Sequence, residues 1–256
     1  MADQDGPLYR RIAEVLRASI LSGELAPGSQ LPSENDLKDR FATTRVTVRK
    51  SLALLKADGL LVSSQGKGVF VRSRPNVQML TTGANFRIRR DTGEANYNAE
   101  AAAQGLVAEQ ELLSVETMPA PAEVADRFGF EVGTAVVVRR RLFRVDGEPM
   151  QLVDGYYSAR RFAGTAVGES RRIRGGVSGL IEDPDGPIRQ RIVQFVEDLE
   201  IRMPKPDEAE ALKIPPGVPV ARVIRTGHVA SGEVIEVLDS LVPCDRHLFR
   251  YVIDVP

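Results

Sequence analysis

The chain has 256 residues, of which 43% are hydrophobic and 27% charged, so it can bury a substantial core and is not disordered throughout. The net charge is -1, but the segment 1–75 carries more Lys and Arg than Asp and Glu (12 against 8), and such a basic end often meets a polyanion. One cysteine, two histidines and the lack of any apolar run of ~20 residues exclude an intramolecular disulfide and a membrane span, and leave few ligands for a metal. We therefore expect a cytoplasmic protein with no metal, no cofactor and no membrane contact.

The N-terminal segment, 1–73, alternates helical periods with turns. Apolar side chains at helical spacing, then two β-prone runs around a polar turn, predict three helices and a hairpin. The expected helices cover residues 7–22, a segment that begins at 33, and 45–57, and the expected strands cover 60–62 and 69–71. Ser33 can cap the second helix, and Asp36 stands where the acid of a capping box would stand. This order of elements is the plan of a winged helix-turn-helix, which we assign to residues 1–73.

The rest of the chain predicts a linker and a second domain. Residues 74–98 are polar and basic and are expected to form the linker. Long β-prone runs with few helical segments over 99–256 predict one antiparallel α+β domain. Its expected strands cover residues 108–118, 135–145, 151–157, 188–203, 220–229, 234–242 and 248–255, and its expected helices cover 120–128 and 207–212. Loops are expected over 160–175, followed by a short apolar segment at 177–181.

The strongest chemical signal is a pair of arginines at the start of the third helix. Arg45 and Arg49 are four residues apart and so lie on one face, which Thr44, Thr47 and Lys50 extend. The N-terminal residues of a recognition helix reach the major groove, where arginine pairs with guanine O6 and N7. Threonine hydroxyls and the N–H groups at a helix start suit phosphates. A basic face that meets only solvent is the alternative interpretation.

Ordered motifs run through residues 8–72. They include Leu31-Pro32-Ser33-Glu34, Thr44-Arg45-Val46-Thr47-Val48-Arg49, Asp58-Gly59-Leu60-Leu61 and Gly66-Lys67-Gly68-Val69-Phe70-Val71. This set resembles the DNA-binding domain of the GntR family of bacterial transcription regulators. The resemblance implies that the two arginines approach bases or phosphates, that Ser33 and the two threonines hold the DNA backbone, and that the wing at 66–68 reaches the minor groove. Asn35 stands where some members place an arginine on a base, so it could read a different base. The expected DNA-binding residues are Ser33, Glu34, Asn35, Thr44, Arg45, Thr47, Arg49, Lys50, Gly66, Lys67 and Gly68.

The second domain carries a looser set of motifs. Among them are Asp146-Gly147-Glu148-Pro149, Gly175-Gly176-Val177-Ser178 and Gly232-Glu233-Val234-Ile235-Glu236. They resemble the effector-binding UTRA domain of the HutC subfamily, which has a chorismate-lyase-like fold. Arg139 and Arg141 lie on one strand face, where the family's binders of phosphorylated sugars hold the anion, and an arginine fork suits phosphate or carboxylate. The expected effector residues are Arg139, Arg141, Tyr157, Ser178, Glu200, Glu236 and Tyr251.

The resemblance implies a transcription repressor whose affinity for operator DNA is controlled by a small anionic or sugar-like effector. Because one winged domain reads few base pairs, we expect a homodimer on a palindromic operator. Two alternatives stay open at this point. One is an effector-free dimeric repressor of the plasmid-transfer type. The other is a chorismate-lyase-like enzyme, against which the sequence offers no nucleophile set and no metal cluster.

Overall fold

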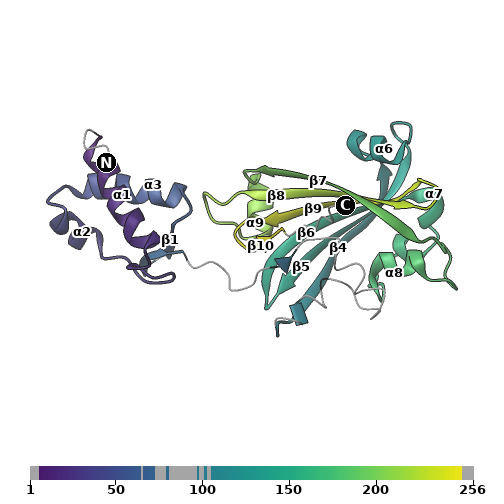
Figure 1. The fold of residues 1–256 in the computed structure, drawn as a ribbon, viewed down its shortest axis with the longest axis horizontal. Coiled ribbons are helices and arrows are strands. Elements are labelled where there is room, and N and C mark those ends of the chain that lie inside the picture. The colour runs from purple at the N-terminus through teal and green to yellow at the C-terminus, as the bar shows by residue number, and fades with distance from the viewer. Residues whose placement is uncertain are drawn as a thin grey trace, which may run out of the picture. The chain divides into compact units, whose positions relative to one another are not determined.

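The computed structural model describes residues 6–64, 66–72, 79–80, 97, 101–102 and 105–249. The chain divides into two compact units, one built mainly from Met1–Asn76 and the other from most of the remainder (Figure 1). Each unit has its own hydrophobic core.

Three helices and a short hairpin form the N-terminal unit. Their bounds are α1 Leu8–Leu21, α2 Glu34–Arg40, α3 Arg45–Ala57, β1 Leu61–Ser64 and β2 Gly68–Val71. The apolar stripes of the helices meet the hairpin in one core, which includes Ile12, Leu16, Leu37, Val48, Leu52, Leu55, Leu61 and Val71. The two strands are antiparallel, with Leu61 opposite Val71. The predicted winged helix-turn-helix is therefore confirmed.

The start of α2 is closed by the expected capping box. The Asp36 backbone N–H donates to the Ser33 hydroxyl oxygen at 3.2 Å, and the Ser33 backbone N–H donates to the Asp36 carboxylate at 3.0 Å. Two N–H groups that a helix start would leave unpaired are thus satisfied reciprocally. This cap therefore fixes the residue at which α2 begins.

A six-stranded antiparallel sheet forms the body of the C-terminal unit (Figure 1). Its order is β4-β5-β6-β9-β8-β7. The bounds are β4 Ala108–Pro119, β5 Ala135–Val145, β6 Glu148–Ser158, β7 Ile192–Arg202, β8 Val220–Val229 and β9 Val234–Pro243. Two consecutive three-stranded meanders are therefore joined where β6 pairs with β9, and β4 and β7 form the edges. The predicted α+β class is confirmed.

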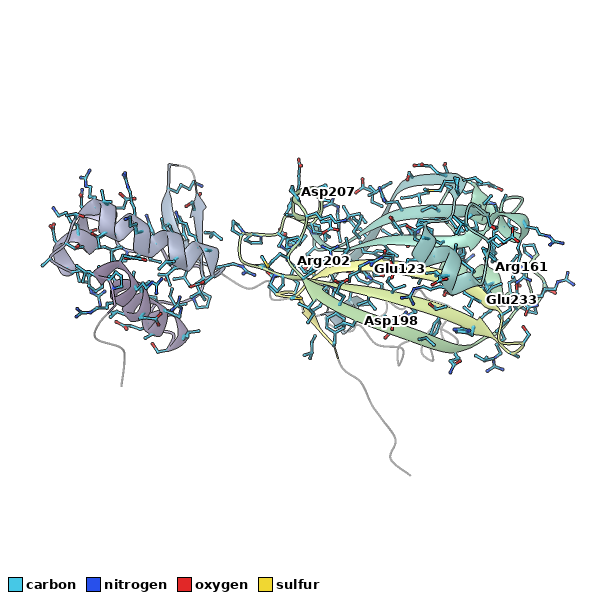
Figure 2. The ribbon with its side chains drawn as sticks, turned by 90° about the horizontal axis from the view of Figure 1, so that it is seen from above. Glu123, Arg161, Asp198, Arg202, Asp207 and Glu233 are labelled. Carbon is cyan, nitrogen blue, oxygen red and sulfur yellow. The ribbon has the colours of Figure 1, made fainter. Side chains whose placement is uncertain are left out.

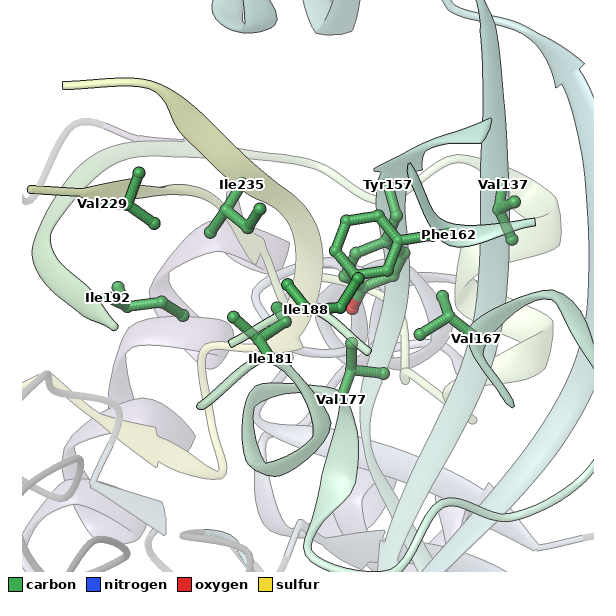
Figure 3. Packing of buried hydrophobic residues seen from close by; sticks show 10 residues of the cluster. All are labelled: Val137, Tyr157, Phe162, Val167, Val177, Ile181, Ile188, Ile192, Val229 and Ile235. Atoms are coloured by element: carbon green, nitrogen blue, oxygen red, sulfur yellow. The ribbon is translucent and has the colours of Figure 1, made fainter. Parts of the chain in front are cut away.

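Helices cover the sheet on two faces. Residues directly opposite each other on antiparallel strands share a face, so Val137 and Tyr157 lie on one face and Val138 and Tyr156 on the other. The first face packs against α7 Ala159–Phe162, a 3-10 turn Ala166–Gly168 and α8 Gly176–Glu182, and Figure 3 shows this cluster. The second face packs against α6 Ala122–Phe128.

Ion pairs follow the sheet on the side of α6. Arg127 contacts Asp198 at 2.7 Å, and Arg222 contacts Glu123 at 2.8 Å and Asp239 at 2.7 Å. Figure 2 labels Glu123 on α6 and Asp198 on β7. These pairs link α6 to β7 and β8. The polar side chains of β7 and β8 that form them therefore lie on the face of the sheet that α6 covers.

Some elements differ from the expectation. Residues 176–182 form a helix, α8, where only a short apolar run was expected, and α7 lies within the expected loop. Helix α9 covers Pro206–Ala211, close to the prediction. Of the expected last strand, 248–255, residues 248 and 249 are described, and Leu248 lies in β10, His247–Leu248, which pairs in parallel with β3, Met79–Leu80. Residues 250–256 and most of the expected linker lie outside the described residues.

Candidate functional site

The start of α3 presents a polar, basic face. Thr44 is the N-cap, and its hydroxyl oxygen accepts from the Thr47 backbone N–H at 3.2 Å. The two threonine hydroxyl oxygens lie 3.0 Å apart. The first turn contains no acidic residue, so the positive end of the helix dipole is not neutralised there by its own helix. An anion such as a DNA phosphate is favoured at this end.

Two residues of α2 hold the arginines of this face. The Nε–H of Arg45 donates to Asn35 Oδ1 at 2.7 Å, and the Nε–H of Arg49 donates to Glu34 Oε2 at 2.8 Å. Both arginines are exposed, and the Arg49 side chain keeps 67% of its surface accessible. The structure therefore brings four of the expected DNA-binding residues into one group on the first turns of α2 and α3.

Ser33 has a narrower part in this group. Its hydroxyl donates to the Asp36 carboxylate at 2.7 Å while it accepts from the Asp36 N–H. The Ser33 hydroxyl and then its N–H hold the pKa of Asp36 below the ordinary value. The hydroxyl proton and one acceptor lone pair are used in the cap, so this side chain fixes the start of α2.

The wing is braced by a residue that sequence reasoning did not single out. Gln30 Nε2 donates to the carbonyl oxygen of Lys67 at 2.7 Å, and the Leu31 N–H donates to the carbonyl oxygen of Val69 at 2.8 Å. Gly68 has φ +116°, a backbone conformation that strains any other residue, and a Cβ there would also displace Gln30 Nε2, which would lie 2.8 Å away. Lys67 is exposed at the tip, and Lys50 is exposed on α3. A polar residue next to the Leu-Pro-Ser motif was the available signal for Gln30.

In the C-terminal unit, both outer nitrogens of Arg139 donate to backbone oxygens. Its side chain is buried, and its Nη1 donates to the carbonyls of Val167 and Glu169 at 2.8 Å and to Ala166 at 3.2 Å. Its Nη2 donates to the carbonyl of Arg171 at 2.8 Å. Burial lowers the pKa of Arg139. This arginine therefore holds the 166–171 loop against the sheet.

Arg141, Tyr157 and Glu236 form a buried polar cluster beside Arg139. Their exposed fractions are 8%, 0% and 1%. A Cβ on Gly155 would lie 2.8 Å from the Tyr157 hydroxyl and 3.0 Å from Arg141 Nη2, so these groups converge over a glycine. Burial raises the pKa of Tyr157, Arg141 acts in the opposite direction, and Glu236 raises it further. The cluster offers a cation, an anion and a hydroxyl in a desolvated place.

The remaining expected effector residues lie elsewhere. Ser178 is half-buried on α8. Glu200 is exposed on the edge strand β7, and its register partner is Arg222, which reaches the α6 face. The structure thus does not bring Glu200 to the cluster, because the cluster lies on the other face. Tyr251 lies outside the described residues.

A hollow of about 600 Å³ lies next to the loop that Arg139 holds. Charged, apolar and glycine residues around α8 line it, namely Ala166, Arg171, Ile173, Arg174, Gly175, Gly179, Leu180, Glu182, Asp183 and Pro187. Ser178 is adjacent to this lining in the chain. Arg139 donates hydrogen bonds to the backbone carbonyls of Ala166 and Arg171, which line the hollow. It therefore connects the buried cluster to one wall of the hollow.

Two further properties concern the described residues only. Among them, no three side chains of His, Cys, Asp or Glu gather in a way that could hold a metal ion. Of the described helices, none has the length and apolar character that crossing a bilayer requires.

Two protein-family models match this chain. "Bacterial regulatory proteins, gntR family" matches residues 8–71, and "UTRA domain" matches residues 103–247. The chain is 31% identical to the HTH-type transcriptional regulator Rv0792c of Mycobacterium tuberculosis, over 91% of this chain and 80% of that protein. It is 26% identical to the HTH-type transcriptional repressor NagR of Bacillus subtilis, over 97% of this chain and 95% of that protein. The crystal structure of PhnF from Mycobacterium smegmatis has the same fold, with a TM-score of 0.59 at 22% identity, covering 96% of this chain and all (100%) of that one.

Proposed function

Because this chain belongs to the HutC branch of the GntR family, with a helix-turn-helix followed by a UTRA domain, it is a DNA-binding transcription regulator, and we propose that it is an effector-controlled repressor. The relatives are transcription regulators, so the chain is not an enzyme and the lyase alternative is set aside. Because a bacterial transcription regulator binds DNA inside the cell, we propose that this protein is cytoplasmic.

The α3 face carries the proposed DNA contact. Arg45 and Arg49 are exposed at the start of α3 and are held at Nε, which leaves the outer nitrogens of both for contacts in a groove. Thr44 and Thr47 stand beside them for phosphates, and Lys50 and the wing residues Gly66, Lys67 and Gly68 extend the contact. One such domain covers a half-site, so we propose a homodimer on a palindrome.

The test of this contact is the Arg45→Ala variant. We expect specific operator binding to fall by about five- to 150-fold, because one bidentate guanine contact contributes about 1–3 kcal/mol of discrimination. Operators selected from random DNA by the parent protein are titrated with both proteins by fluorescence anisotropy. Lys56→Ala is the matched control, since it removes a charge from the last turn of the same helix. Tight sequence-specific binding by Arg45→Ala would exclude this contact.

The buried cluster carries the proposed effector site. Arg141 can hold an anionic group, Glu236 can accept from hydroxyls or an amine, and Tyr157 can donate through its hydroxyl. Arg139 positions the loop beside them. A small molecule that is anionic or sugar-like matches these groups. Ser178, next to the hollow, is proposed as a further contact.

A thermal-shift screen tests the effector site. Phosphorylated sugars, amino sugars, small carboxylates and histidine-pathway metabolites are the ligands, and one at 100 times its dissociation constant should stabilise the protein by about 2.7 kcal/mol. Arg141→Ala should keep operator binding and lose most of this shift. Arg140→Ala is the matched control, because Arg140 is the next residue on β5 but pairs with Asp154 on the other face.

Two results would contradict the effector site. A normal ligand response by Arg141→Ala would remove Arg141 from it. A silent screen, together with intact operator binding, would favour the effector-free repressor instead.

A further inference from the structure

Asn35 and Arg45 are joined in a way that constrains both side chains. The Nε–H of Arg45 donates to the Asn35 amide at 2.7 Å. An arginine has only donors, so the amide atom that faces it must be the oxygen. The Asn35 amide nitrogen therefore points elsewhere, and it forms no hydrogen bond with the residues that the structure describes.

This contact limits how Arg45 can meet a base. Its Nε–H is already used, so only the outer pair, Nη1 and Nη2, is available for guanine O6 and N7. Within the described part of the chain, these outer nitrogens form no hydrogen bond. Arg45 is thus held in an end-on arrangement before DNA arrives.

The same contact limits how Asn35 can meet a base. Asparagine normally reads adenine with both amide atoms, accepting from N6 and donating to N7. Here the bond from Arg45 uses one of the two lone pairs of the oxygen and fixes the direction of the amide, so the nitrogen, which can only donate, is the atom turned away from Arg45. A donor suits the acceptors of guanine, thymine and adenine in the major groove and does not suit the N4 donor of cytosine.

We propose that Asn35 and Arg45 act as one reading unit, in which Asn35 fixes Arg45 for a guanine and its own amide nitrogen favours a neighbouring base that offers an acceptor over cytosine. This inference rests on the operator binding proposed above. Glu34 and Arg49 provide a comparison within the same face. Their contact at 2.8 Å also uses the arginine Nε, but the carboxylate has no donor to offer a base.

The unit acts on DNA recognition and adds little to folding. Both residues are exposed, and a single exposed contact contributes little to stability. Without Asn35, the Arg45 side chain is ordered only on binding. Ordering one such side chain lowers affinity by about three- to tenfold.

Two variants at the same position separate the two roles. Asn35→Ala removes both the acceptor for Arg45 and the donor for the base. Asn35→Asp keeps the acceptor and replaces the donor with a second acceptor, which suits the N4 donor of cytosine. Lys38→Gln on the same helix controls for the charge change, because it also lowers the net charge by one.

The experiment uses the full chain and a panel of single base changes in the operator that it selects from random DNA. The position at which Arg45→Ala loses its preference identifies the guanine. We expect Asn35→Ala to bind the best site about three- to tenfold more weakly and to discriminate less at this position and at its neighbour. Asn35→Asp should keep the guanine preference and shift the neighbour toward cytosine. Lys38→Gln should weaken all sites equally.

The outcomes distinguish this inference from the proposed function. If the parent protein selects no sequence, operator binding itself is wrong, and the reading unit with it. If a sequence is selected but Asn35→Ala keeps both preferences, only the reading unit is wrong. Loss of the guanine preference in Asn35→Asp, with an unchanged melting temperature, would also overturn it, because that variant retains the acceptor for Arg45.

Discussion

Replacing Arg139 tests whether its guanidinium anchors the 166–171 loop. The buried side chain donates to four backbone oxygens, those of Ala166, Val167, Glu169 and Arg171. Nη1 has two hydrogens for three of these oxygens, so the bond to Ala166 at 3.2 Å is the weakest. Three good charge-assisted bonds therefore connect the loop to the sheet.

We expect Arg139→Ala to lower the free energy of unfolding by about 3–5 kcal/mol, the range for removing one partner of a buried charged network. The lower end is favoured because Glu169 and Arg171 are exposed, so their carbonyls can regain water, whereas Val167 is buried. Arg139→Lys keeps the charge but loses the planar fork that reaches two directions. We expect it to lose about 1.5–3 kcal/mol of stability, roughly one charge-assisted bond.

Urea unfolding followed by circular dichroism measures these losses, and limited proteolysis reports whether the loop is released. Arg140→Ala on the other face is the control and should lose no more than about 1 kcal/mol, since its side chain is 53% exposed in its pair with Asp154. A loss below about 1 kcal/mol in Arg139→Ala, or full stability in Arg139→Lys, would refute the anchoring role.

Two further predictions concern the cap of α2 and a histidine with a buried ring nitrogen. Ser33→Ala should lower the stability of the N-terminal unit by about 1 kcal/mol, because it removes the side-chain half of the capping box, and Ser33→Thr should recover most of it in the same urea titration. Burial lowers the pKa of His247 to about 4 from 6.5, so the unfolded chain takes up its proton first as the pH falls. Stability should drop by at most about 2 kcal/mol between about pH 7 and 5, and His247→Gln should lose this dependence; an unchanged slope in that variant would contradict it.

Much of the fold could be predicted because local signals agreed with it. Helix α3 begins after a threonine cap and carries a clear apolar period, so its bounds match the expectation. Helix α8 could not be predicted, because the glycines at 175, 176 and 179 oppose helix formation. Its helix is held by the burial of Val177 and Ile181 in the core, which the local sequence does not reveal.

The candidate sites divide in the same way. The alternation of β5 correctly predicts that Arg139 and Arg141 share a face, and the motifs place the arginines of α3 at a helix start. The sequence could not reveal that Arg139 bonds to a loop far along the chain, at Glu169 and its neighbours. Nor could it give the face of Glu200, because a shift of one residue in the register between strands would reverse it. The contacts of Asn35 and Glu34 depend on how two helices cross.

The order of strands in the sheet bears on how the C-terminal unit assembles. Strands β4, β5 and β6 follow one another along the chain, as do β7, β8 and β9, so each half can form through nearby hairpins. The strands of the two halves pair where Leu152–Tyr156 of β6 lies beside 237–241 of β9, two segments that are far apart in the chain. Closing so large a loop is entropically slower than closing a hairpin. We therefore expect the pairing of β6 with β9 to form more slowly than the hairpins within each half.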